Sequence, residues 1–389
     1  MENETYLPDY RGGSIVNLMG SIKKAFGGSS LYGPLKGFDI SGLAKKNIVL
    51  IVIDGLGYEY LVKYGQDSFL RENLRGKMTS VFPATTAAAM TSFLSGVAPQ
   101  QHALTGWFMY LKEAGILSVV IKFISRAGRI DLCKSRISFN DIYGQESFFE
   151  KLDATSFLVK RKDYIGKAYS LATSRGAEKL GYATLNGFFR QIRRALDGSS
   201  RNRKYVFAYW DKFDGVCHKK GTDSREAEKH FRELDKKIAS LAKSLKDKDT
   251  AIIVTADHGL IDTRESGKII ELKDHPEFVA TLSMPLAGEL RAAYCYVKPD
   301  KTGQFEEYVK RNFSRYCNMH KSADLIEKNY FGLYEPDRRL EDRVGDYTLI
   351  MKDNYIIKDS VLGEEYKIFI GNHGGTSKEE MFVPLIVIG

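Results

Sequence analysis

The sequence predicts an α/β fold in which a mainly parallel central sheet is flanked by helices and carries a smaller α+β insertion. Three observations predict it. Apolar runs of strand length recur along the chain, and a long amphipathic stretch lies between two of them. Polar residues and Gly follow the runs at 47–53, 205–209 and 251–255. Because strands buried on both faces alternate with helix, we expect most of the strands to be parallel.

Four apolar runs are the expected strands of the sheet. The first is NIVLIVI at residues 47–53, which ends at the turn sequence Asp54-Gly55-Leu56-Gly57. Its continuous β-branched content is typical of a strand buried on both faces. Similar runs are YVFAY at 205–209 and AIIVT at 251–255, and residues 383–388 close the chain as another strand.

An amphipathic helix is expected between the second and third of these strands. Apolar residues recur there at steps of four and three, which places them on one helical face. They are Ala227, Phe231, Leu234, Ile238, Leu241 and Leu245. We expect this stripe to cover one face of the sheet.

The remaining segments give a coarse domain organisation. Residues 270–365 differ in pattern, with predicted strands at 291–297 and 346–351 around a helix at 304–313. Residues 111–200 are expected to contain helices and charged loops. The predicted division is therefore an N-terminal segment that packs on the core (1–45), a catalytic domain (46–269 and 366–389) and an α+β insertion (270–365).

Composition excludes several classes of protein. With 43% hydrophobic and 28% charged residues, the chain has the balance of a folded globular protein rather than a disordered one. It contains no run of about 20 apolar residues, so no membrane span is expected. The first 30 residues lack the apolar core of a signal peptide, and we therefore expect a cytoplasmic protein. The four cysteines stand far apart without a CxxC pair, which predicts reduced thiols.

The chain carries a net charge of +9, which favours an anionic partner. Part of the excess lies in one basic stretch, and two interpretations are open for it: contact with a phosphate backbone, or a solvated helix face. No aromatic interleaving or nucleic-acid motif accompanies the stretch, so nucleic acid is not the expected partner. The residues concerned are Arg190, Arg193, Arg194, Arg201, Arg203 and Lys204.

Residues of metal-ligand type follow the predicted strands. Ligands of open α/β sheets bind beyond the carboxyl ends of the strands, so these positions are candidate site residues. A single Asp-His-Gly or Gly-Asn-His-Gly-Gly sequence is more often a turn, but the joint occurrence at several strand ends favours a metal site. Six nitrogen and oxygen ligands of this type suit two divalent ions of the Zn²⁺ class. The residues are Asp54, Asp214, His218, Asp257, His258 and His373.

A candidate nucleophile lies in the segment FPATTAAAMT at residues 82–91. Its two adjacent threonines stand at the start of an Ala-rich helix, where Thr85 could simply be the N-cap. A hydroxyl at this position faces backbone N–H groups that attract an anion, and coordination to a metal would lower its pKa for attack as an alkoxide. The residue types therefore point to transfer of a phosphoryl group.

Together these motifs resemble the alkaline phosphatase superfamily and, within it, the type I phosphodiesterase/nucleotide pyrophosphatase family. The resemblance covers roughly residues 46–110, 204–260 and 366–389, and the order and spacing of its motifs make it specific. The motifs are IDGLG (53–57), FPATTAAAMTSFLSG (82–96), DGVCH (214–218), ADHG (256–259) and GNHGG (371–375).

The resemblance implies an alkaline phosphatase-like fold and a site that holds two divalent ions, Zn²⁺ with Mn²⁺ as the alternative. Thr86 is implied as the nucleophile, because the family's nucleophile stands ten residues before the Gly that ends its motif, as Thr86 does before Gly96. A phospho-Thr intermediate would then be resolved by water. The implied ligands are Asp54, Thr86, Asp257 and His258 for one ion, and Asp214, His218 and His373 for the other.

Two positions differ from the family's usual pattern. Nucleotide pyrophosphatases of the family carry an Asn about twenty-one residues after the nucleophile, where this chain has Trp107. Phe213 and Cys217 replace the Pro and Gly that usually flank the first two ligands of the second ion. Trp107 and Phe108 are candidate substrate-binding residues, since their rings could stack on a base or line an apolar pocket.

The expected function is that of a metal-dependent hydrolase that cleaves phosphodiester or pyrophosphate bonds in a small phosphorylated substrate. The alternatives are a phosphomonoesterase or phosphonate hydrolase of the same superfamily, and a basic nucleic-acid-binding protein with a structural metal site. Structural zinc sites are closed four-ligand clusters, whereas this set includes a hydroxyl and leaves open positions. A diester is favoured over a monoester because residues 82–96 contain no Lys or Arg; Arg126 and Arg161 are the distant cations that could change this.

Overall fold

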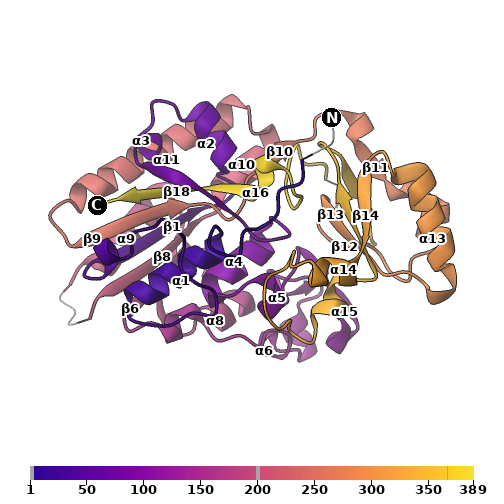
Figure 1. Cartoon of the computed structure of the whole chain (residues 1–389), viewed down its shortest axis with the longest axis horizontal. Coiled ribbons are helices and arrows are strands. Elements are labelled where there is room, and N and C mark those ends of the chain that lie inside the picture. Colours follow the sequence, from indigo (N-terminus) through magenta and orange to yellow (C-terminus); the bar gives the residue numbers. More distant parts are fainter. Residues whose placement is uncertain (1–3, 199–201, 366) are drawn as a thin grey trace.

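The computed structural model describes residues 4–198, 202–365 and 367–389, which form two seven-stranded sheets side by side (Figure 1). The larger, central sheet occupies the left part of Figure 1. Its strands, in spatial order, are β2 (Leu74–Thr79), β18 (Phe382–Ile388), β9 (Thr250–Thr255), β1 (Asn47–Ile53), β8 (Lys204–Trp210), β6 (Thr155–Arg161) and β7 (Ala177–Tyr182).

The central sheet is mainly parallel, as the sequence predicts. Strand β1 pairs in parallel with β8 and β9, and β6 pairs in parallel with β7 and β8. Only β18 runs antiparallel to its neighbours β9 and β2. The four predicted strands are β1, β8, β9 and β18, and the observed bounds differ from the predicted ones by one residue at most.

Residues 111–200, which were expected to contain helices and loops, also supply strands β6 and β7 of the central sheet. Strand β6 has the sequence TSFLVKR and ends in two basic residues, so its apolar run is short. Strand β7 lies at the edge of the sheet, and only two of its six residues, Leu180 and Tyr182, are buried. Neither strand therefore shows the continuous apolar run that identifies β1.

Helices cover both faces of the central sheet (Figure 1). The predicted amphipathic helix is α11, and the five apolar residues of its stripe from Ala227 to Leu241 are buried. The helices of the described residues are α1 (Ile15–Ala25), α2 (Tyr58–Tyr64), α3 (Phe69–Glu72), α4 (Thr86–Ser95), α5 (Pro99–His102), α6 (Phe139–Ile142), α7 (Lys162–Ile165), α8 (Ala168–Thr173), α9 (Leu185–Leu196), α10 (Lys212–Lys220), α11 (Arg225–Ser244), α12 (Pro276–Val279), α13 (Thr302–Tyr308), α14 (Ser322–Glu327), α15 (Leu340–Val344) and α16 (Lys378–Met381).

The second sheet combines two distant parts of the chain. Its strands, in spatial order, are β14 (Cys317–Lys321), β15 (Tyr347–Met351), β13 (Ala292–Cys295), β12 (Ala287–Gly288), β3 (Phe108–Leu111), β4 (Ile116–Val119) and β5 (Ile124–Ser125). The two parts meet where Gly288 of β12 pairs with Phe108 of β3. Residues 108–125 thus complete a sheet whose other half comes from 287–351, while the predicted division into domains stays a prediction.

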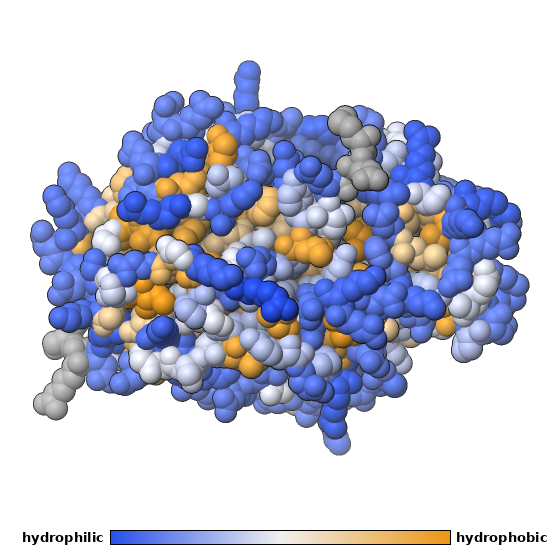
Figure 2. Space-filling model, in the orientation of Figure 1, coloured by the Kyte–Doolittle hydropathy of each residue, from blue (hydrophilic) through white to orange (hydrophobic). Residues whose placement is uncertain are grey.

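The surface and the N-terminal helix complete the fold. In the view of Figure 2, hydrophilic residues cover most of the visible face and hydrophobic residues show as separate groups. Helix α1 is part of the main core, since Ile15, Leu18, Met19 and Ile22 are fully buried. Within the described ranges, no helix is both long enough and apolar enough to span a lipid bilayer.

A buried ion pair joins the two sheets. Arg291, which precedes β13, donates through Nε to Oε1 of Glu380 at 3.1 Å and through Nη2 to Oε2 at 2.8 Å. Glu380 belongs to α16, which leads into β18 of the central sheet. Both side chains are essentially inaccessible to solvent. Burial alone would raise the pKa of Glu380, but the Arg291 guanidinium keeps it below its ordinary value.

We expect Glu380→Ala to lower the free energy of unfolding by about 3–5 kcal/mol, because it leaves the Arg291 charge buried without a partner. Chemical denaturation measures the change. Glu365→Ala is the matched control, since it removes a carboxylate of an exposed pair with Lys367 and should have little effect. Equal effects of the two substitutions would contradict a structural role for the buried pair.

Candidate active site

All predicted ligand residues lie at the carboxyl edge of the central sheet or beside it. Asp54 follows β1, and Asp257 and His258 follow β9. Asp214 and His218 stand one turn apart on α10, the helix that follows β8. His373 lies in the loop between β17 (Gly371–Asn372) and α16. The carboxyl ends of the parallel strands therefore bring candidate ligand residues from distant parts of the chain close together.

A close backbone approach sets the spacing of the loops after β1 and β9. A Cβ atom on Gly259 would lie 2.0 Å from the carbonyl oxygen of Glu379 and 2.9 Å from Cα of Gly57. Any side chain at Gly259 would push these segments apart. The glycine that follows His258 is thus required for packing against α16 and the β1 loop.

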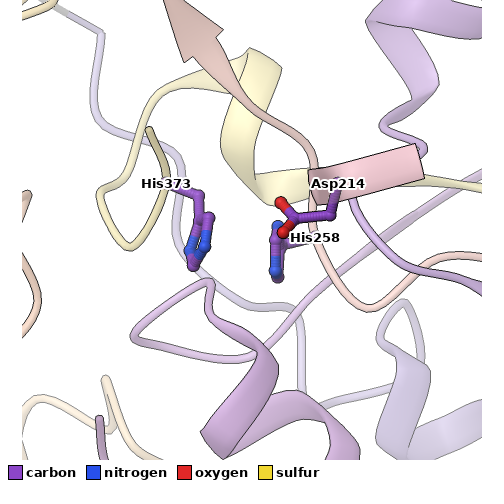
Figure 3. Close-up of side chains that lie close together, drawn as sticks. All are labelled: Asp214, His258 and His373. Carbon is purple, nitrogen blue, oxygen red and sulfur yellow. The ribbon is translucent and has the colours of Figure 1, made fainter. Parts of the chain in front are cut away.

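The ligand atoms form two overlapping groups. One atom each from Asp54, Asp257 and His258 lie within 4.8 Å of one another, and the same holds for Asp214, His258 and His373. Figure 3 shows the second group converging from three separate segments. His258 thus belongs to both groups, whereas the family pattern places it with Asp54 and Asp257.

His218 and Thr86 join this cluster through single contacts. Nε2 of His218 lies 3.0 Å from Oδ2 of Asp214, and Oγ1 of Thr86 lies 3.1 Å from Nε2 of His258. The same His258 nitrogen is 3.4 Å from Oδ1 of Asp54. The structure therefore brings all seven predicted metal-binding residues together.

Surrounding groups orient the ligands. Nδ1 of His218 donates to the carbonyl oxygen of Gly371 at 2.6 Å, and Nδ1 of His258 donates to that of Gly259 at 3.0 Å. These bonds fix the tautomer that leaves Nε2 free to bind a cation. The hydroxyl of Tyr209 donates to the Asp54 carboxylate, which orients that group as well.

The electrostatics of the cluster fit a bound cation. Burial and the nearby Asp257 and Asp214 raise the pKa of Asp54 far above its ordinary value. Burial and the neighbouring His258 lower the pKa of His373. Within the described ranges, four buried atoms of the cluster have no hydrogen-bond partner: Oδ1 of Asp54, Oδ1 of Asp214, Oδ2 of Asp257 and Nδ1 of His373. Divalent cations would satisfy these atoms and offset the repulsion between carboxylates.

The two adjacent threonines have different environments. Thr85 occupies the N-cap position of α4, but its hydroxyl makes no capping hydrogen bond and instead donates to Oε1 of Glu289 at 2.6 Å. Thr86, the first residue of the helix, directs its hydroxyl towards His258. Only the Thr86 hydroxyl is therefore in contact with the ligand cluster.

A large cavity of about 1570 Å³ opens over the cluster. Its wall includes Thr86, His218 and the two aromatic residues Trp107 and Phe108. Cations already lie over both rings: Nζ of Lys122 is 5.3 Å from the Trp107 centroid, and the Arg126 guanidinium is 3.9 Å from the Phe108 centroid. The aromatic wall is therefore less apolar than its sequence indicates.

Arg126 and Arg161 both line the cavity, and both are paired with carboxylates. Arg126 lies 2.5 Å from Asp359 and 3.0 Å from Glu364. Arg161 lies 3.2 Å from Asp211 and 2.5 Å from Asp163. Their charges are largely offset before any substrate binds.

Two cavity residues had no signal in the sequence. Lys160, at the end of β6, is buried and donates to Oγ of Ser170 at 3.0 Å, and burial lowers its pKa to about 8. Glu289, directly after β12, accepts hydrogen bonds from Thr85 and from the Trp107 amide. Recognising β6 as a strand would have identified Lys160 as a strand-end residue, whereas Glu289 lies in a loop without a motif.

The basic stretch near residue 200 contributes to internal structure. Arg203 donates to the carbonyl oxygens of Lys46, Ala25 and Leu43. Lys204 is buried and its Nζ donates to the carbonyls of residues 196–198. Arg201 lies outside the described residues. At least two of the six basic side chains thus bind the protein itself.

Solved structures that share this fold include pyrophosphatase/phosphodiesterases and a phosphonoacetate hydrolase. Murine ectonucleotide pyrophosphatase/phosphodiesterase 5 superposes with a TM-score of 0.66 at 17% identity, covering 87% of each chain. The human protein gives 0.66 at 16% identity, covering 88% of each chain. Phosphonoacetate hydrolase from Sinorhizobium meliloti 1021 in complex with phosphonoformate gives 0.64 at 17% identity, covering 88% of this chain and 90% of that one. At these identities the likeness shows the fold.

The family assignment comes from the sequence profile. No curated protein sequence matches the chain significantly. The profile of the family described as type I phosphodiesterase/nucleotide pyrophosphatase matches residues 48–376, which include all the residues gathered in the cluster. The chain therefore belongs to the type I phosphodiesterase/nucleotide pyrophosphatase family of phosphoester hydrolases.

Proposed function

We propose that this hydrolase cleaves phosphodiester or pyrophosphate bonds of a small phosphorylated substrate, with Thr86 as the nucleophile. The observation that carries the proposal is the position of the Thr86 hydroxyl, 3.1 Å from His258 and exposed to a cavity of about 1570 Å³. A nucleophile, a set of cation ligands and space for a substrate meet at one point. The cytoplasmic location expected from the sequence stays a prediction.

The proposed cofactor is a pair of divalent ions, Zn²⁺ or Mn²⁺. Asp54, Thr86, Asp257 and His258 would hold one, and Asp214, His218 and His373 the other. When bound, such ions neutralise phosphoryl oxygens and lower the pKa of a coordinated hydroxyl. The buried ligand atoms without hydrogen-bond partners support the proposal.

The chain's own groups bind and orient the phosphoryl group. Oγ1 of Thr86 gives up its proton and forms the bond to phosphorus while the bond from phosphorus to the leaving oxygen breaks, and the leaving group departs and takes up a proton. Backbone N–H groups at the start of α4 face the phosphoryl oxygens and favour their negative charge. Water then hydrolyses the phospho-Thr ester, which releases phosphate monoester and restores the Thr86 hydroxyl. Tyr209 keeps Asp54 in place during both steps.

The absence of basic residues from the segment around the nucleophile and the pairing of Arg126 and Arg161 favour a diester over a monoester. The segment from Phe82 to Gly96 carries no Lys or Arg, and the charges of Arg126 and Arg161 are offset by carboxylates. A monoester dianion has an additional negative charge that a positioned Arg would normally meet. A diester monoanion needs less compensation.

A phosphonate hydrolase is the second candidate, and Lys160 is the observation that favours it. This buried ammonium group lines the cavity and donates a hydrogen bond to Ser170. It also lies 5.9 Å from the ring of Tyr209, the residue that binds Asp54. A carboxylate on the leaving group of a phosphonate could pair with this charge.

The purified protein should bind two divalent ions per chain, because seven ligand residues exceed one tetrahedral site. His218→Ala or His373→Ala should lower the content towards one ion and abolish turnover. Elemental analysis measures the content. His275→Ala, at a histidine that contacts Tyr308 instead of the cluster, is the control and should keep both ions. Full activity of metal-free protein would contradict the proposal.

Thr86 should become phosphorylated during turnover, whereas Thr85 should not. We expect Thr86→Ala to lower kcat by about a thousandfold or more, since it removes the nucleophile, and Thr85→Val to keep most activity. Rapid quenching followed by peptide mass spectrometry locates the phosphate. If only the Thr85 variant lost activity, the assignment within the pair would be wrong; if neither did, the covalent mechanism would be.

An aryl diester should be the better substrate. For thymidine 5′-monophosphate p-nitrophenyl ester, kcat/KM should exceed that for p-nitrophenyl phosphate by about tenfold or more, because the added charge of the monoester is not met. Phosphonoacetate is assayed in parallel. Preference for the monoester would identify a phosphatase, and turnover of phosphonoacetate alone, lost in Lys160→Met, would establish the second candidate.

A further inference from the structure

Glu289 is a carboxylate of the cavity wall that contacts both the residue next to the proposed nucleophile and the backbone of Trp107. Its Oε1 atom accepts a hydrogen bond from the hydroxyl of Thr85, the residue before Thr86, at 2.6 Å. The same oxygen accepts from the backbone N–H of Trp107 at 2.7 Å. Trp107 is the position at which the family's nucleotide pyrophosphatases carry Asn. The carboxylate therefore lies at the phosphoryl end of the cavity, of which it forms part of the wall.

The position of this carboxylate is fixed by its surroundings. A Cβ atom on Gly374, the residue after His373, would lie only 2.7 Å from Cβ of Glu289. The backbone at Gly374 has φ of +110°, which a residue with a side chain rarely adopts. Glu289 thus packs against the loop that carries a ligand histidine, while two hydrogen bonds hold its tip.

The charge of Glu289 is not offset by a basic side chain. No Lys or Arg forms an ion pair with it among the described residues, in contrast to Arg126 and Arg161, whose charges have carboxylate partners. Burial raises the pKa of Glu289 to about 7, and the hydrogen bonds from Thr85 and Trp107 oppose that rise. At mildly alkaline pH the group is a carboxylate facing the cavity.

We infer that Glu289 is a specificity-determining residue whose negative charge disfavours doubly charged phosphate monoesters relative to singly charged diesters. The inference rests on the proposed function of the same site. Like charges within a few ångströms repel strongly where solvent is partly excluded. The monoester carries one more negative charge than the diester, so the same carboxylate raises the barrier for the monoester more.

Substitution by Gln separates the charge of Glu289 from its hydrogen bonds. The amide oxygen of Gln can still accept from Thr85 and Trp107, while the negative charge is lost. Thr85→Val does the reverse, because it removes one hydrogen bond and keeps the charge. Glu226→Gln removes a carboxylate from the exposed rim of the same cavity, where it lies 3.8 Å from Lys220.

The test compares kcat/KM for p-nitrophenyl phosphate and for thymidine 5′-monophosphate p-nitrophenyl ester at pH 8.5, with the metal-loaded protein. We expect Glu289→Gln to raise the monoester-to-diester ratio by about tenfold, the order expected for one partly screened charge. Thr85→Val and Glu226→Gln should each change the ratio less than about twofold. Metal content and thermal midpoint are measured for each variant, and Glu289→Met replaces the Gln variant if that does not accumulate.

Two results would overturn the inference while leaving the proposed function in place. One is an unchanged ratio in Glu289→Gln with intact metal content and diester activity. The other is an equal rise in Thr85→Val, which would show that position, rather than charge, sets the preference. A metal-loaded wild-type protein that cleaves neither ester would instead overturn the proposed function, and the inference with it.

Discussion

The repulsion between three buried carboxylates is the constraint on which the rest of the structure depends. Asp54, Asp214 and Asp257 leave water together, beside the imidazoles of His218, His258 and His373. Such a cluster is unfavourable unless cations compensate it and the backbone holds it in place. The loops that carry the ligands come from strands far apart in sequence. The fold must therefore restrain these loops against the charges they bring together.

Glu380 supplies much of that restraint. Its carboxylate accepts from the N–H of Gly375, two residues after His373, at 2.7 Å, and its carbonyl oxygen accepts from the N–H of Gly259 at 2.9 Å. One residue thus ties together the loops of two ligand histidines, whose rings stack 3.8 Å apart. Arg291 holds Glu380 from the side of the second sheet. The second sheet is consequently part of the support for the ligand cluster and not only a wall of the cavity.

The sequence predicted the elements with local signals and missed those that depend on distant pairing. The continuous apolar run of β1 and the apolar stripe of α11 are visible in short windows of sequence, and they were predicted correctly as a strand and as an amphipathic helix. Strands β6 and β7 have mixed composition and gain their stability from long-range partners, so no local pattern revealed them. Glu289 stands between Gly288 and Leu290 without a recognisable motif, and its contact with Thr85 spans 204 residues. Only the folded chain shows that it belongs to the site.

The residues that line the cavity near Thr86 show where this chain differs from its family. The residues of metal-ligand type match the family pattern, whereas Phe213 and Cys217 beside two of them do not. Trp107 is another difference, since the family's nucleotide pyrophosphatases carry Asn there, and its backbone N–H donates to Glu289. An amide that could contact a phosphoryl oxygen has thus given way to a ring that contacts Lys122 and to a nearby carboxylate. Because Arg126 and Arg161 are paired with acids, the cavity charges with no ion-pair partner of opposite sign among the residues that the structure describes include the carboxylate of Glu289 and the ammonium group of Lys160. The proposed selection among substrates by charge therefore depends on this wall, whereas the proposed bond cleavage depends on the cluster of Asp and His residues beside Thr86.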